Sequence, residues 1–197
     1  MRTVNPEQHA RKRARILEAA AQEFAEGGMD GTSTARICRR AGIGSGTLFH
    51  YFPTKRAIFH ALFADDLAGN AEVRVRALAD GSAGAGLDLL VEHLVGDLAD
   101  PLVPGLAAAA LLQANRDAEF AELLADDEEQ TLRALTTLLD RMSGEGRPPR
   151  FPPPRAARWI VSLIDATFLA TTAADFDPRA HAAELRELVA WLTARTP

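Results

Sequence analysis

The segment "GIGSGTLFHYFPTK", residues 42 to 55, holds three glycines, three aromatic residues and one histidine in a stretch too short to form a core of its own. After the glycine-containing turn, Ser45 begins a short helix in which Leu48 and Phe52 lie four positions apart and can both point inward. The sequence from Ser45 to Tyr51 contains no carboxylate. A helix surface without negative charge can enter a DNA groove, whose walls carry phosphates. The side chains left to point at least partly outward are Thr47, Phe49, His50 and Tyr51.

The residues before this segment predict two further helices. Residues 9 to 27 carry one apolar stripe at helical spacing, and the glycines at its end stop the helix. Residues 32 to 34 offer hydroxyl caps for a second short helix that ends at Gly42. Two short helices joined by a tight glycine-containing turn form a helix-turn-helix, here from Ser33 to Phe52. The alternative is a bundle of three small helices that binds no DNA.

The charges are divided unevenly along the chain. Residues 1 to 60 hold ten Lys/Arg and five Asp/Glu, whereas residues 61 to 197 hold twelve Lys/Arg and twenty-two Asp/Glu. This division, a basic N-terminal segment followed by an acidic remainder, indicates that the N-terminal segment binds a polyanion. The basic residues at positions 11 to 15 could reach the DNA backbone or minor groove, or could equally form a solvated helix face.

Composition places the chain among soluble globular proteins, with 197 residues that are 47% hydrophobic and 25% charged. A single cysteine, Cys38, is typical of a reducing compartment and excludes an internal disulfide framework. The longest purely apolar run, Leu106 to Leu112, is far shorter than the roughly 20 residues that span a bilayer. We therefore expect a cytoplasmic protein without a secretion signal or membrane span.

The run from Ile16 to Phe63, "ILEAAAQEFAEGGMDGTSTARICRRAGIGSGTLFHYFPTKRAIFHALF", resembles the N-terminal domain of the TetR family of bacterial transcriptional regulators. The most specific part is "GTLFHYFPTK", and the resemblance covers about the first third of the chain. It implies an all-α fold of about nine helices, with a three-helix DNA-binding head at residues 1–53 and an effector-binding and dimerisation body at residues 54–197. It also implies a homodimer that is usually a repressor released by a small molecule.

The resemblance assigns roles to residues of the head. Tyr51 and Lys55 would contact backbone phosphates, and Thr47 would approach a phosphate or a base edge. Ser33 and Thr34 would help to fix the register on the duplex. Base discrimination would fall to Ser45, Gly46, Thr47, Phe49 and His50. The expected core residues are Ile16, Phe24, Ile37, Ile43, Leu48, Phe52 and Phe59.

This chain departs from the family pattern at three positions of the head. Phe49 stands where a tyrosine is common, so a hydroxyl contact is missing there. Arg39 and Arg40 stand where an acidic residue is frequent, which would add positive charge near the DNA. We expect these departures to change specificity and to leave binding intact.

Beyond residue 63 the pattern predicts helices over 54 to about 78, 87–99, 102–115, 118–143, 155–174 and 179–195. "GSAGAG", residues 81–86, is interpreted as a linker, and the proline-rich residues 144–154 as a loop. The last helix carries one apolar stripe at helical spacing, and the helix from Arg155 is apolar on more than one side. The pair therefore predicts either a fully intramolecular core or, as in the family, a twofold dimer interface. Such a dimer would match a palindromic operator whose half-sites lie about 34 to 36 Å apart. The expected interface residues are Trp159, Leu163, Leu185, Leu188, Val189 and Leu192.

The middle helices supply candidate walls for a small, largely hydrophobic effector. Apolar residues at helical spacing can equally be ordinary core. The candidate effector-binding residues are His93, Leu94, Leu98, Leu111, Asn115, Phe120, Leu124 and Phe168.

An enzyme is the competing class of protein, and the sequence does not favour it. The five histidines are scattered and no HExxH motif occurs, so we expect no catalytic site, no metal site and no cofactor. Three alternatives stay open within DNA binding: an activator, a regulator without an effector, and a nucleoid-type protein that binds DNA without sequence preference. A palindrome bound far more tightly than random duplex at fixed salt would exclude the last of these.

Overall fold

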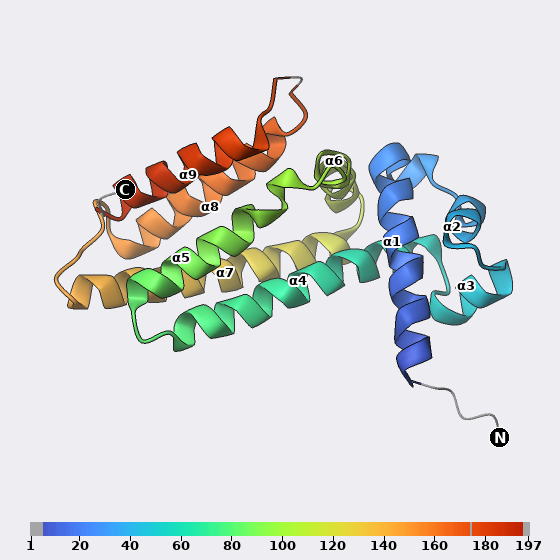
Figure 1. Cartoon of the computed structure of the whole chain (residues 1–197), viewed down its shortest axis with the longest axis horizontal. Helices are drawn as coiled ribbons and strands as arrows, with labels where there is room; N and C mark the ends of the chain where they lie inside the picture. Colours follow the sequence, from blue (N-terminus) through green and yellow to red (C-terminus); the bar gives the residue numbers. More distant parts are fainter. Residues whose placement is uncertain (1–5, 174, 195–197) are drawn as a thin grey trace.

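The computed structural model of the protein describes residues 6–173 and 175–194, and the described chain is helical throughout, with no strand (Figure 1). This confirms the predicted all-α fold. The predicted helix ends at residues 174 and 195 lie outside the described residues. The elements are α1 (Pro6–Gly31), α2 (Thr34–Ala41), α3 (Ser45–Tyr51), α4 (Lys55–Ala79), α5 (Ala83–Gly96), the 3₁₀ helix η1 (Asp97–Ala99), α6 (Val103–Ala114), α7 (Ala118–Gly144), α8 (Pro153–Ala170) and α9 (Pro178–Leu192).

Local sequence signals fix the ends of the first helices. Gly28, with φ 61°, interrupts α1 at the predicted end of the first helix. The Arg36 N–H donates to Ser33 Oγ at 3.3 Å, which caps α2, and the Ala57 N–H donates to Thr54 Oγ1 at 3.0 Å, which caps α4. Gly42 ends α2 in the left-handed region, with φ 63°, where a residue with a side chain would be strained.

Helices α1, α2 and α3 form the head, whose buried core is completed by the start of α4, by Ala109 of α6 and by Phe120 of α7. The expected core residues are buried, except Ile43, which is half-buried. The Phe24 and Phe59 rings meet edge to face with centroids 4.9 Å apart, and the Phe59 and Phe120 centroids are 5.1 Å apart. The head is therefore joined to the body by a shared aromatic cluster.

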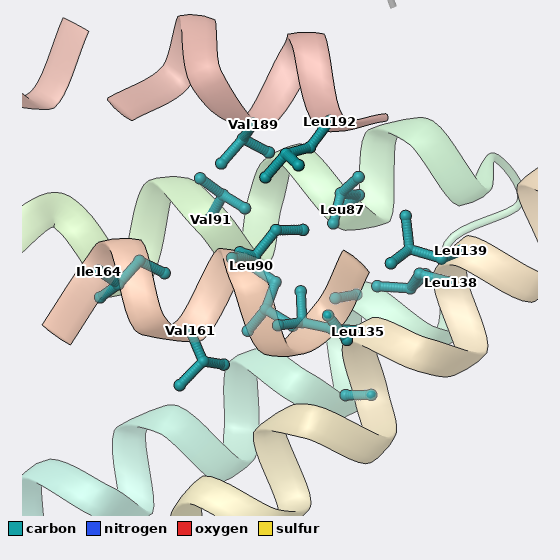
Figure 2. Close-up of a cluster of buried hydrophobic side chains, with 14 of the residues drawn as sticks. Leu87, Leu90, Val91, Leu135, Leu138, Leu139, Val161, Ile164, Val189 and Leu192 are labelled. Atoms are coloured by element: carbon teal, nitrogen blue, oxygen red, sulfur yellow. The ribbon is translucent and has the colours of Figure 1, made fainter. Parts of the chain in front are cut away.

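Helices α4 to α9 with η1 form the body around a second core, and in Figure 1 α1 crosses the long body helices steeply. Figure 2 shows how side chains of α5, α7, α8 and α9 converge in this core. The labelled members are Leu87, Leu90, Val91, Leu135, Leu138, Leu139, Val161, Ile164, Val189 and Leu192.

The interpretation of residues 81–86 as a linker is wrong, because α5 already begins at Ala83. The Ala85 N–H donates to Ser82 Oγ, which caps the helix. Gly86 is buried, and a Cβ there would lie 2.3 Å from the Ala77 carbonyl oxygen at the end of α4. The glycine lets two helices approach each other closely, so its role is packing and not flexibility.

Gly86→Ala is expected to lower the free energy of unfolding by about 1 to 3 kcal/mol, because backbone atoms of α4 and the buried Leu138 would have to move to admit a methyl group. The matched control is Gly81→Ala, where an added Cβ meets nothing within 4 Å. Denaturant unfolding of both variants checks the prediction. Equal stability of the two variants would contradict the close packing of α4 against α5.

Within the described residues, no single helix is long and apolar enough to cross a membrane. The pair Ala83–Ala99 and Val103–Ala114 meets the length and composition needed only when taken together, and it is bent by 103°.

Candidate DNA-binding surface and effector cavity

Helix α3 presents the outward face that the sequence predicts. Leu48 is fully buried and Phe52 nearly so, and they anchor the helix to the head. Phe49 is 49% exposed although it is a large apolar side chain. Ser45, Gly46 and His50 are also exposed, and Thr47 and Tyr51 are half-buried. The exposed face of α3 carries hydroxyls, rings and an imidazole, and no carboxylate.

A residue that sequence reasoning missed supports this face from α1. The His9 ring lies against the Tyr51 ring with centroids 4.4 Å apart, and Tyr51 in turn meets His50 edge to face at 5.4 Å. These contacts limit the orientations available to Tyr51 and His50. No local pattern points to His9, because its contact with α3 exists only once α1 has packed across the head.

Lys55 makes contacts that the sequence does not predict. Its Nζ donates to the Met29 carbonyl at 2.5 Å and to the Thr32 carbonyl at 2.7 Å, and so ties the start of α4 to the turn between α1 and α2. An ammonium group has three N–H donors, so one stays available for a phosphate. Ser33 uses its hydroxyl to cap α2, and Thr34 is half-buried at the first residue of that helix. The phosphate contacts of all three residues stay predictions.

The positive charge that Arg40 adds to the head is paired with carboxylates of α1. Arg40 Nε donates to Glu23 Oε1 and an Arg40 terminal nitrogen donates to Glu26 Oε1, both at 2.7 Å. Arg36 Nε lies 2.5 Å from the other Glu23 oxygen. Burial raises the pKa of Glu23, but the hydrogen bond from Arg40 and the charges of Arg36 and Arg40 outweigh it and lower the pKa overall. Arg40 therefore holds α2 to α1, whereas Arg39 is exposed.

The Glu23 ion pairs predict acid sensitivity. A carboxylate whose pKa is lowered by folding stabilises the folded state above its unfolded pKa, about 4.3, and the contribution is lost as the pH falls through the folded value. The free energy of unfolding should therefore decrease from about pH 5 downward. Glu23→Gln should be less stable than wild type at pH 7 and lose less stability on acidification. Parallel loss in the two proteins between pH 7 and pH 3 would contradict this role.

A buried carboxylate links the start of α4 to α6 and α7. Asp117 accepts from Arg56 Nε at 2.7 Å and from Gln113 Nε2 at 3.0 Å, and it lies 2.8 Å from His60 Nε2. The hydrogen bond from Arg56 is the main cause that holds the pKa of Asp117 far below its usual range, so the group stays charged. Sequence reasoning could have found Asp117 only as the residue that caps α7.

Helix α6 touches the head directly. A Cβ on Gly105 would lie 2.2 Å from the Ala25 carbonyl oxygen of α1, so the two helix backbones are in close contact. Figure 1 shows α6 beside α1, at the end of the body nearest the head. A displacement of α6 would therefore also shift α1.

The structure does not gather the eight candidate effector residues into one pocket. Phe120 is buried in the aromatic cluster between head and body, and Leu124 packs on that cluster. Leu98 belongs to the body core, against which Leu94 packs. Leu111 and Asn115 are exposed, and His93 Nε2 lies 2.9 Å from Asn70 Oδ1. Phe168 lines a cavity between helices of the body.

That cavity has a volume of about 290 Å³, is partly open to solvent, and is lined by residues of α4, the η1 turn, α6 and α8. Its formation depends on the turn after α5, which brings acidic residues beside the apolar faces of α4 and α6. The lining residues are Leu62, Phe63, Asp66, Asp97, Asp100, Val103, Leu106, Ala107 and Phe168.

The expected dimer interface needs a correction. Leu185, Val189 and Leu192 are buried against the body of their own chain, so they are core residues. Trp159 and Leu188 are 48% and 47% exposed, as expected for an unpartnered face, and Leu163 is half-buried. Two apolar residues that the prediction omitted, Leu169 and Trp191, are also exposed on α8 and α9.

The comparisons with known proteins agree with this fold and this head. Residues 16–62 match the family described as "Bacterial regulatory proteins, tetR family". The chain is 30% identical to the HTH-type transcriptional repressor Rv1474c of Mycobacterium tuberculosis (strain ATCC 25618 / H37Rv) over 185 residues, which cover 94% of this chain and 95% of that protein.

Solved structures share the architecture over almost the whole chain. A TetR transcription regulator from Haloarcula marismortui ATCC 43049 superposes with a TM-score of 0.81 at 17% identity, covering 94% of this chain and 97% of that one. FadR from Bacillus subtilis, solved in complex with stearoyl-CoA, superposes with a TM-score of 0.70 at 21% identity, covering 89% and 96%. Family, relative and fold agree, so the chain belongs to the tetR family of bacterial transcriptional regulators and is not an enzyme.

Proposed function

We propose that this protein is a repressor that binds a palindromic operator as a homodimer and is released by a small, largely hydrophobic molecule. The observation that carries the proposal is the exposed, carboxylate-free face of α3 on a head that shares its core with the body. Residues 1–53 would act as the DNA-binding domain and residues 54–197 as the effector-binding and dimerisation domain, in the cytoplasm where the operator lies.

On the DNA, α3 would lie in the major groove. Phe49 and His50 face outward and would meet base edges, where a ring can contact a thymine methyl group. Gly46 is exposed without a side chain, which permits close approach of the backbone. Thr47, Tyr51 and the free N–H of Lys55 would contact phosphates and fix the register.

Two copies would pair through the exposed apolar residues of α8 and α9. These two helices form the upper edge of the body in Figure 1. A twofold axis there would place one α3 at each half-site of a palindrome. Large exposed apolar side chains are typical of such interfaces, and tryptophan is enriched in them.

The effector would release the protein from DNA by displacing α6. Val103, Leu106 and Ala107 of α6 line the cavity, and Gly105 of the same helix contacts Ala25 of α1. A molecule that displaces α6 would therefore move the head and change the spacing of the two α3 helices, so that both half-sites can no longer be engaged. FadR of Bacillus subtilis, which has the same fold, was solved with stearoyl-CoA bound, so this fold can hold a small molecule.

Three variants test the assigned roles on α3 and at the start of α4. Tyr51→Phe keeps the ring packed on His9 and removes only the hydroxyl, so affinity should fall severalfold on every duplex. Lys55→Ala should also weaken binding to all sequences. His50→Ala should change the preferred base as well as the affinity. Binding is measured by fluorescence anisotropy at fixed salt, with unfolding curves as the control for Lys55. Unchanged affinity in all three variants would show that α3 is not the reading helix.

A further inference from the structure

The cavity between α4, η1, α6 and α8 combines aromatic walls with negative charge. Phe63 and Phe168 contribute rings, and Asp66, Asp97 and Asp100 contribute three carboxylates. Among residues 6–173 and 175–194, no salt bridge neutralises any of these three side chains. Asp100 alone has a hydrogen-bonding role, since its Oδ1 accepts from the Leu102 N–H at 2.8 Å.

None of the residues that line the cavity carries a positive charge, so the lining itself does not balance the three carboxylates. Arg74 already pairs with Asp127 at 2.6 Å, and Asn70 donates to the same carboxylate at 3.0 Å. Asp66, Asp97 and Asp100 are all exposed residues. Partial desolvation of the Asp66 carboxyl group, followed by the charge of Asp97, still raises the pKa of Asp66; His93 partly opposes this, and Asp127 adds to it. A group whose ionisation is disfavoured by desolvation and by a like charge gains when a cation arrives.

The lining of the cavity favours an organic cation over a metal ion as the bound group. Over the described part of the chain, no three His, Cys, Asp or Glu side chains are placed to hold a metal. The remaining lining is apolar, with Leu62, Val103 and Leu106 among its residues. A ring face attracts an ammonium group, and apolar walls favour a hydrocarbon body. The volume of about 290 Å³ lies just below the range of ligand pockets, which span about 300 to 1,000 Å³, so the molecule is small.

We propose that the effector of this protein is a small organic cation, an ammonium or amidinium group on an apolar body, held by Asp66 and Asp97 with Phe63 and Phe168 as walls. This inference rests on the proposed function, because it names the chemical class of the molecule that releases the repressor.

Three probes with one arylalkyl body and different charges test the inference: 4-phenylbutylamine, which is protonated at pH 7, neutral 4-phenylbutanol, and anionic 4-phenylbutyrate. Binding to the full-length protein is measured by isothermal titration calorimetry, and release of the protein from operator DNA by anisotropy. The cation should bind at least about tenfold more tightly than the alcohol, and the anion least tightly of the three.

Asp66→Asn and Asp97→Asn should each reduce affinity for the amine by about tenfold and leave affinity for the alcohol unchanged, because only the charge is lost. Asp140→Asn, an exposed position on α7 that does not line the cavity, is the matched control and should bind the amine like wild type. Unfolding temperatures of all three variants confirm that each is folded.

The outcomes separate the two proposals. Amine binding that depends on Asp66 and Asp97 supports the cation site, whether or not DNA is released, and failure to release DNA would overturn only the proposed effector-controlled repression. DNA release by the alcohol or the anion, with the aspartate variants unaffected, would overturn the cation inference and leave the repressor proposal standing. Equal affinity for all three probes, or binding by none, would also overturn it.

Discussion

Phe49→Glu is expected to weaken binding of this protein to duplex DNA by about a hundredfold or more. Phe49 is half exposed on α3, and the described residues show no aromatic partner for its ring, so the substitution costs little folding energy. The new carboxylate would lie between phosphates in the groove, and a like-charge placement at an interface costs several kcal/mol. Each 1.4 kcal/mol is a tenfold loss of affinity.

Two control variants isolate the cause of this loss. Phe49→Gln removes the ring without adding charge and should lose much less affinity than Phe49→Glu. Val75→Glu adds the same charge to the body at a position that is 68% exposed, and it should bind DNA almost like wild type. Anisotropy titrations at one salt concentration measure all three. If Phe49→Glu binds DNA like Val75→Glu, the face of α3 does not meet DNA.

The double variant Trp159→Glu/Leu188→Glu is expected to be a monomer that has lost most of its affinity for the operator. Both side chains are about half exposed on α8 and α9, and four carboxylates would face one another across a twofold axis. A monomer engages one half-site at a time. In the dimer, binding of one head holds the second head at a high effective concentration near its half-site, and loss of this effect should lower the affinity for the operator by about a hundredfold or more.

The matched control for the dimer face is Val75→Glu/Leu112→Glu, which adds the same charge at exposed apolar positions of α4 and α6. Sedimentation velocity gives the mass of each variant, and anisotropy gives its affinity. A Trp159→Glu/Leu188→Glu protein that is still dimeric would show that the chains pair elsewhere.

Features encoded by neighbouring residues could be predicted from the sequence. Ser33 and Thr54 cap helices that begin where the hydroxyl caps indicated, and Gly28 interrupts α1 where the glycine pair predicted an end. The inward and outward sides of α3 also follow from local spacing, which is why Leu48 is buried and Phe49 exposed. Each of these features depends on contacts within one or two helical turns.

Features that depend on the packing partner could not be predicted in the same way. A stripe at helical spacing indicates burial but does not say against which surface. The pattern therefore predicts a dimer contact for Leu185 and Val189, whereas both belong to the core of their own chain. Phe120 likewise fills the junction between head and body. The role of Gly86 and the carboxylates of the cavity become visible only when α4, η1 and α6 come together.

The central claim is that two copies of α3, held by a symmetric pair of chains, read a palindrome. The most direct measurement selects duplexes from a random library with the full-length protein, then compares the selected site, a single half-site and a random duplex at one salt concentration, with the mass of each complex determined. We expect an inverted repeat that binds two or more chains about a thousandfold or more tighter than the random duplex. A single bound chain, or one affinity for all three duplexes, would contradict it.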